Sequence, residues 1–256
     1  MERFARLADT FFDLEVMRRA FADLLTEGLV NTIYISASAM LFGLAGGLVF
    51  ALMAISRRWW IRLPARAYVD LFRGLPAILV ILLVGLGLPT AGIRPFGRYT
   101  PAYAILALSI IAAAYITEIL RAGIQSVEKG QMEAARSLGM TYLQAMWLVI
   151  VPQGVRRVLP PLTNEFIILT KDSSLLFVLG LSLGERELYR IGQQVASRTG
   201  NYSAVMLAGL FYLLITIPLT RLVNYMDTRM REGKPGAGEE EPLELDPSAS
   251  VPGGRR

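Results

Sequence analysis

Residues 28–56 read GLVNTIYISASAMLFGLAGGLVFALMAIS and contain no Asp, Glu, Lys or Arg. A helix that crosses a bilayer needs about 20 mainly apolar residues, because each residue rises about 1.5 Å through a hydrocarbon layer of about 30 Å. This stretch exceeds that length, so it predicts a transmembrane helix.

Three further uncharged stretches have the same character, and they are residues 74–93, 99–117 and 199–220. A fifth stretch, residues 158–184, is mostly apolar but carries several polar side chains. Only helices that satisfy their own backbone hydrogen bonds can cross lipid as single chain segments. The sequence therefore predicts an all-α integral membrane protein with about five transmembrane helices.

The composition favours transport over catalysis. The chain is 54% hydrophobic and 18% charged, with a mean hydropathy of +0.45, and it contains no Cys and no His. Disulfides, thiolate nucleophiles, imidazole acid–base chemistry and the usual zinc ligands are thereby excluded. The pI of about 9.6 arises from positive residues beside the spans, so a nucleic-acid partner is not expected.

The distribution of Lys and Arg predicts the orientation of the chain in the membrane. The connector after the first span contains four arginines and no acid, and its side of the membrane carries the larger share of positive residues. Cytoplasmic loops carry this excess. We therefore expect a multi-pass protein of the bacterial cytoplasmic membrane with its N-terminus outside and its C-terminus in the cytoplasm.

The two ends differ from the membrane domain at 28–230. In residues 1–27 four apolar side chains recur at helical spacing among charges, and they are Leu14, Met17, Phe21 and Leu24. This pattern indicates a helix lying in the membrane interface, with a short solvated helix as the alternative. Residues 231–256 are rich in Gly, Pro and Glu, which predicts a disordered cytoplasmic tail.

The most informative connector, residues 128–152, reads EKGQMEAARSLGMTYLQAMWLVIVP. Gly139 can adopt the left-handed conformation that ends a helix, and Thr141 with Gln144 has capping-box spacing to begin another. Pro152 is expected to limit the second helix. Small side chains at Ala134 and Ala135 leave one face of the first helix nearly bare, which predicts a docking hairpin.

This stretch resembles the EAA loop of binding-protein-dependent ABC importer permeases, in Glu133-Ala134-Ala135, Gly139 and Val151-Pro152. Val151 departs from the leucine that the family usually has before the proline. Flanking residues narrow the resemblance to permeases for polar amino acids such as histidine, glutamine and glutamate, and they lie within residues 69–76, 114–126 and 152–175. The likeness covers roughly residues 28–230.

The resemblance implies a type I ABC importer permease fold in which the loop at about 127–152 forms coupling helices. The residues that it assigns to ATPase coupling are Glu133, Ala134, Ala135, Gly139 and Pro152. It implies four partners besides membrane lipid: a dimer of ATPase subunits, a second permease chain that is identical or homologous, an extracytoplasmic solute-binding protein and an amino-acid substrate.

The chain itself is not expected to be an enzyme. It contains no Gly-x-x-x-x-Gly-Lys-[Ser/Thr] phosphate loop, so ATP and Mg must be bound by the partner ATPase, and no cofactor is expected on this chain.

Polar residues inside the predicted spans indicate a substrate pathway, and they are Glu118, Asn164, Glu165, Lys171 and Asp172. An unpaired charge in lipid costs several kcal/mol, so these groups must face protein, water or one another. Asn164 and Glu165 are the preferred candidates. A break in the backbone after Asp172 would let it pair with Lys171, and an ion pair with Arg121 is the alternative role for Glu118.

Two other classes of protein remain to be weighed. An ion-coupled secondary transporter would use Glu118, Glu165 and Asp172 as ion sites, but it leaves the cytoplasmic hairpin unexplained. A membrane scaffold or membrane enzyme explains neither the polar residues in the spans nor the hairpin.

Overall fold

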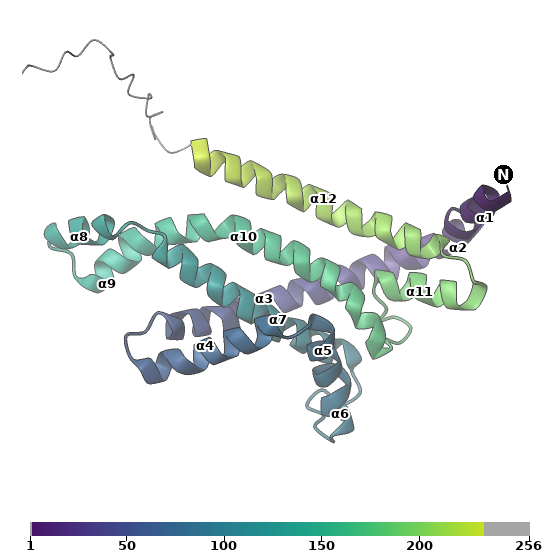
Figure 1. The fold of residues 1–256 in the computed structure, drawn as a ribbon, viewed down its shortest axis with the longest axis horizontal. Coiled ribbons are helices and arrows are strands. Elements are labelled where there is room, and N and C mark those ends of the chain that lie inside the picture. Colours follow the sequence, from purple (N-terminus) through teal and green to yellow (C-terminus); the bar gives the residue numbers. More distant parts are fainter. Residues whose placement is uncertain (1, 233–256) are drawn as a thin grey trace, which may run out of the picture.

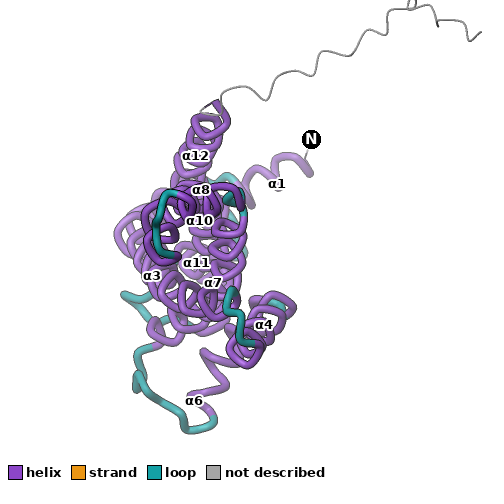
Figure 2. The backbone as a smooth tube through the Cα atoms, turned by 90° about the vertical axis from the view of Figure 1, so that its left-hand side faces the viewer, coloured by secondary structure: helices purple, strands orange, loops and turns teal. Residues whose placement is uncertain are grey.

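The computed structural model describes residues 2–232, in which every regular element is helical (Figure 1). The elements are α1 (Glu2–Phe11), α2 (Leu14–Asp23), η1 (Leu24–Gly28), α3 (Leu29–Ala54), α4 (Trp59–Gly74), α5 (Ala77–Leu82), η2 (Leu83–Gly87), α6 (Leu88–Thr90), α7 (Thr100–Gln125), α8 (Lys129–Ser137), α9 (Tyr142–Ala145), η3 (Met146–Ile150), α10 (Val151–Asp172), η4 (Ser173–Leu179), α11 (Leu188–Thr199) and α12 (Ser203–Glu232). The helices α3, α7, α10 and α12 run along the long axis of the molecule, and Figure 2 looks down this bundle.

Three helical runs in the described chain are long and apolar enough to cross a membrane, and they are Asp9–Ala54, Thr100–Gln125 and Ser203–Arg229. A fourth is obtained when α4 and α5 to α6 count as one bent span. The fifth predicted span corresponds to the second half of α10 and to η4, which are too polar to be counted. The predicted all-α membrane architecture is thus confirmed.

The second predicted span differs in structure from the helix that the sequence predicted. The arginine-rich stretch expected as a connector is largely helical and forms the start of α4, and the chain then bends by 105° between α4 and α5. Pro76 disfavours a helical conformation at Leu75, whose φ of −86° and ψ of 141° are extended. The apolar helix that follows, residues 77–90, is only about 21 Å long. It projects sideways from the bundle (Figure 1).

The N-terminal helix is continuous with the first span. Helix α2 passes through η1 into α3, so the expected division between residues 27 and 28 falls within one helix. Leu24 is fully buried, whereas Phe21 is half exposed and stands 5.7 Å from the ring of Phe211 in α12. The interfacial placement of residues 1–27 stays a prediction, and most of the predicted tail, residues 233–256, lies outside the described residues.

Close packing between α3 and α7 forms the centre of the bundle. A Cβ atom added to Gly47 would stand 2.7 Å from Ile116 Cγ2, and one added to Gly43 would stand 2.7 Å from Ala112 Cβ. Thr117 Oγ1 donates a hydrogen bond to the carbonyl oxygen of Gly47 at 3.3 Å. Small residues let membrane helices approach closely, and here they bring the two backbones together. The remaining helices are arranged around this pair.

Candidate functional site

A helical hairpin stands at one end of the bundle, far from α1 and α11 (Figure 1). Gly139 links its two helices with a φ of +86°, as predicted for a left-handed helix terminus. The Thr141 backbone N–H donates to Gln144 Oε1 at 2.8 Å, and the Gln144 N–H donates to Thr141 Oγ1 at 3.2 Å. The predicted hairpin and its capping box are both confirmed.

The second helix of the hairpin does not end near Pro152, so that expectation is wrong. Helices α9, η3 and α10 follow one another without a break from Tyr142 to Asp172. Pro152 lies in the first turn of α10, immediately after a π-helical turn. The wider π turn changes the local hydrogen-bond pattern, so the missing N–H of proline is accommodated without ending the helix. The hairpin is therefore joined to the bundle by continuous helix.

Ala135 was expected to lie open to a partner, and that expectation is also wrong. It is only 4% exposed, because η3 folds back onto α8 within the same hairpin. Glu133, Ala134 and Gly139 are exposed, as is Pro152.

The hairpin exposes large apolar side chains that sequence reasoning missed, and they are Leu138, Tyr142, Leu143, Trp147 and Leu148. Leu138 is 82% exposed and Leu143 is 67% exposed. The signal in the sequence was the presence of large apolar residues next to the motif in a connector between spans. Such a cluster outside the spans is typical of a surface that another protein covers.

Two adjoining cavities lie where α4 and α10 approach α7; the first is mainly polar, and the second is mainly apolar with charged side chains in its lining. One of about 270 Å³ is lined by Arg66, Asp70, Arg73, Glu118 and Arg121, and the other, of about 500 Å³, shares Arg73 and Glu118 and adds Arg157. The Glu118 carboxylate accepts from Arg121 Nε at 3.0 Å and from Arg121 Nη2 at 2.6 Å. The ion pair considered for Glu118 is thus present. Guanidinium groups outnumber carboxylates around the cavities, so they suit a small molecule that carries a carboxylate.

Residues 43–232 match the family model of the binding-protein-dependent transport system inner membrane component. The match covers well over half of the chain. The chain belongs to this family. The hairpin and the long helices that carry it are therefore parts of an inner-membrane transport component.

Individual relatives of this inner-membrane component agree in length and fold. The chain is 39% identical over 206 residues to a probable glutamine ABC transporter permease protein of Bacillus subtilis (strain 168), with 80% of this chain and 93% of the relative covered. It is 36% identical over 211 residues to a glutamate/aspartate import permease protein of Escherichia coli O157:H7, with 80% and 92% covered. A solved chain described as an amino acid ABC transporter with histidines is 35% identical, with a TM-score of 0.73 and coverage of 82% and 95%.

In this inner-membrane component the polar residues of α10 do not all face one common site. Asn164 is exposed, whereas its neighbour Glu165 is 4% exposed and lies among the charges of Asp172 and Arg73. The helix changes to a 3₁₀ turn after Asp172, as the sequence predicted. Lys171 is nevertheless exposed, and no ion pair within 4.0 Å joins it to Asp172 in the described chain. The ion pair that a broken backbone could have allowed is not formed, because the break lies beyond both residues and leaves them on the regular helix.

A buried carboxylate at the opposite end of the bundle was not anticipated. Glu187 is fully buried at the start of α11 and accepts from the backbone N–H groups of Tyr189 at 2.5 Å and Arg190 at 2.6 Å. It also accepts from Tyr212 Oη at 3.0 Å, and that hydroxyl lies 3.5 Å from Ser173 Oγ. Glu187 thus links α11, α12 and the break after α10. Its position outside every predicted span and motif explains why sequence reasoning missed it.

Glu187 is expected to make stability depend on pH. Burial raises its pKa from 4.5 to about 8, although hydrogen bonds from Tyr189, Tyr212 and Arg190 oppose the rise. The pKa of Glu187 is higher in the folded chain than in the unfolded chain, so between the two pKa values the folded chain binds more protons. The free energy of unfolding therefore falls as pH rises from about 5 to about 8. We expect Glu187→Gln to flatten this decline in thermal-shift measurements on the purified chain. Glu185→Gln, two residues away, should keep the wild-type slope, and an equal slope in all three proteins would contradict the assignment.

Proposed function

We propose that the chain is the permease subunit of an ATP-driven importer that admits a polar amino acid to the bacterial cytoplasm. The observation that carries the proposal is the continuous helix from Tyr142 to Asp172, which joins an exposed hairpin to the polar interior of the bundle. The relatives supply the chemical class of the substrate, since they are named as permeases for glutamine, glutamate/aspartate and arginine. The chain carries no catalytic site in this proposal.

The hairpin is the surface on which the ATPase docks. Leu138, Leu143 and Trp147 offer the apolar contacts, while Glu133 and Ala134 lie beside them at the exposed side of α8. Gly139 sets the angle between the two helices, and Ala135 lets them pack closely. Movement of the docked ATPase is passed to the membrane part through the unbroken helix beyond Pro152.

Substrate passes the two cavities and the residues near them. Arg73 lies at the meeting point, because it lines both cavities and its charge acts on Glu165. An amino acid carries both an ammonium and a carboxylate, and this neighbourhood offers Glu118 and Glu165 for the first and arginines for the second. Asn164, exposed on α10, adds an amide that can donate and accept hydrogen bonds.

The remaining partners follow from this arrangement. The hairpin lies in the cytoplasm, and the end that carries α1 and α11 faces outward toward a solute-binding protein. A second permease chain, identical or homologous, completes the pathway. ATP and Mg are bound by two ATPase subunits and not by this chain.

Reconstitution in proteoliposomes tests the proposal. The permease with its ATPase, a second permease where one is needed and the binding protein should accumulate radiolabelled amino acid only when ATP is supplied. The chain alone should neither hydrolyse ATP nor transport. Uptake driven by a sodium or proton gradient without an ATPase would favour the secondary transporter.

Two substitutions test the substrate pathway. Asn164→Ala and Glu165→Ala should change substrate-stimulated ATP hydrolysis in the assembled complex, since each removes a polar group from the proposed route. Asn224→Ala, an exposed amide on α12, serves as the matched control. Wild-type uptake and wild-type stimulation in both α10 variants would remove these residues from the route.

A further inference from the structure

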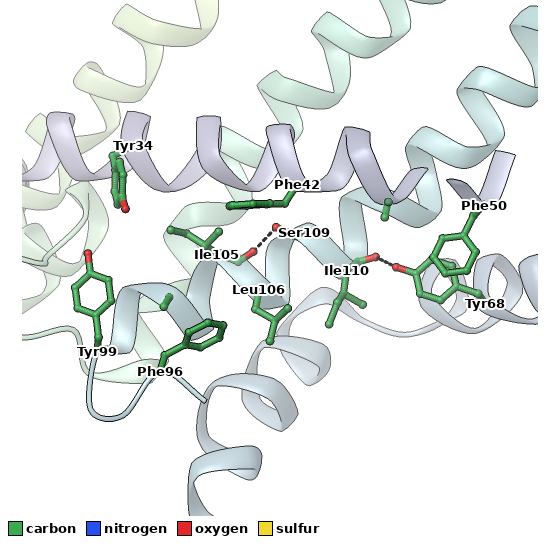
Figure 3. Close-up of a pocket in the computed structure, with 13 residues that line it drawn as sticks. Tyr34, Phe42, Phe50, Tyr68, Phe96, Tyr99, Ile105, Leu106, Ser109 and Ile110 are labelled. Carbon is green, nitrogen blue, oxygen red and sulfur yellow. Dashed lines mark hydrogen bonds between the residues drawn. The ribbon is translucent and has the colours of Figure 1, made fainter. Parts of the chain in front are cut away.

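A long apolar groove runs between α3 and α7 (Figure 3), and it shares no lining residue with the two cavities described above. Its volume is about 550 Å³. Phe42 and Phe50 line one wall from α3, and Leu106 and Ile110 line the facing wall from α7. Neither the hairpin nor the polar pathway uses this groove.

The polar groups of the groove are unevenly distributed. Tyr68 Oη donates to the carbonyl oxygen of Ile110 at 2.6 Å, and Ser109 Oγ donates to the carbonyl oxygen of Ile105 at 2.6 Å. Both hydroxyls are hydrogen-bonded to backbone carbonyl groups of the chain itself. The middle of the groove and the end near Tyr68 therefore present mainly apolar atoms to a bound molecule. At the other end the hydroxyls of Tyr34 and Tyr99 point toward one another, and both side chains are about half exposed (Figure 3). The groove is therefore apolar along its length and polar at one end.

The groove has the length and the lining of a site for one hydrocarbon chain. The α3 residues that line it extend from Tyr34 to Phe50, which corresponds to about 24 Å of helix. A hydrocarbon chain packs against its neighbours at about 3.5–4.0 Å and fits such a channel. Gly46 helps to give the groove its depth, because a Cβ there would stand only 3.3 Å from Ala113 Cβ.

We propose that this groove binds one acyl chain of a membrane phospholipid, with the lipid's polar head at the Tyr34 and Tyr99 end. The hydrophobic effect does not drive this binding, because the chain leaves surroundings that are equally apolar. The gain comes from van der Waals contact with the aromatic walls and from hydrogen bonds of the two tyrosine hydroxyls to ester or phosphate oxygens. Tyrosine is suited to this position, since its ring lies in apolar surroundings while its hydroxyl reaches the polar layer.

Photolabelling tests the proposal on the assembled permease and ATPase complex. The complex is reconstituted in vesicles of phosphatidylcholine that carries a photoactivatable diazirine on one acyl chain, and labelled peptides are mapped by mass spectrometry. We expect label to concentrate on residues 34–50 and 99–113. Leu106→Trp and Ile110→Trp should each lower this labelling about tenfold, which corresponds to about 1.4 kcal/mol of lost binding. Leu52→Trp, on an exposed part of α3 outside the groove, should leave it unchanged.

Two results would overturn the assignment. Label spread evenly over the exposed faces of α3 and α12, with no effect of either groove variant, would show that the groove holds no particular lipid. Because the chain has no native cysteine, Phe42→Cys supplies a single thiol in the groove. Efficient disulfide crosslinking of this variant to a second permease chain would identify the groove as a protein interface. Thermal-shift measurements establish that each tryptophan variant is folded before it is labelled.

Discussion

Ala135→Arg is expected to abolish most ATP-driven uptake by the reconstituted transporter while membrane insertion persists. Ala135 is 4% exposed and packs inside the hairpin, where an arginine side chain would have to displace its neighbours or bury its charge. An unpaired buried charge costs about 3 kcal/mol or more, which lowers the equilibrium constant for closing the hairpin about a hundredfold. Since the closed hairpin is the proposed ATPase contact, we expect uptake to fall at least about tenfold. Insertion should persist because the residue lies outside the spans.

The neighbouring residue provides the control for this substitution. Ala134→Arg adds the same charge on the same turn of α8, but Ala134 is exposed, so the hairpin should remain closed. Limited trypsin digestion of the two variants separates the cases, since an open hairpin is cleaved faster. If Ala135→Arg resists trypsin and supports wild-type uptake, the hairpin is not the coupling element. Loss of ATPase co-purification with Ala134→Arg alone would show that the partner covers the exposed side of α8.

Gly47→Leu is expected to prevent a stable bundle from forming. Its Cβ would stand 2.7 Å from Ile116 Cγ2 and 3.2 Å from the carbonyl oxygen of Ala113, so α3 and α7 must separate to admit the side chain. Such overpacking costs about 1–3 kcal/mol and occasionally more. For a chain of this size each kcal/mol lowers Tm by about 2–4 °C. We therefore expect Tm to fall by about 2–12 °C, or no recoverable folded protein where the cost is larger.

Gly209→Leu is the matched control, because no atom outside the local helix lies within 4 Å of a Cβ placed there. Gly209 is in α12, another long apolar helix, so the two variants add the same side chain to the same kind of helix, at a buried position in α3 and at an exposed one in α12. Thermal-shift measurements on both proteins in one detergent give the comparison. Equal Tm values for wild type and Gly47→Leu would show that close approach of α3 and α7 is not required.

Local patterns in the sequence were sufficient for much of the fold. Uncharged runs marked the long helices, and the hairpin followed from Gly139 and from the pair Thr141 and Gln144, because helix caps depend on residues within one turn of each other. Proline was harder to interpret. Pro152 ends no helix, whereas Pro76 stands at a bend of 105°, because the outcome at a proline depends on how the neighbouring turns are packed.

The sequence by itself determined that this is a helical membrane protein with a capped helical hairpin between two long helices, because local hydrophobicity and helix capping decide those features. Only the tertiary structure decided that Ala135 faces its own hairpin, that Asn164 and Glu165 lie in different surroundings, and that Glu187 joins three elements. The groove between α3 and α7 likewise exists only in the folded tertiary structure. Each of these depends on contacts between residues far apart in the chain, and such contacts arise only when helices pack and exclude lipid and water from their shared faces.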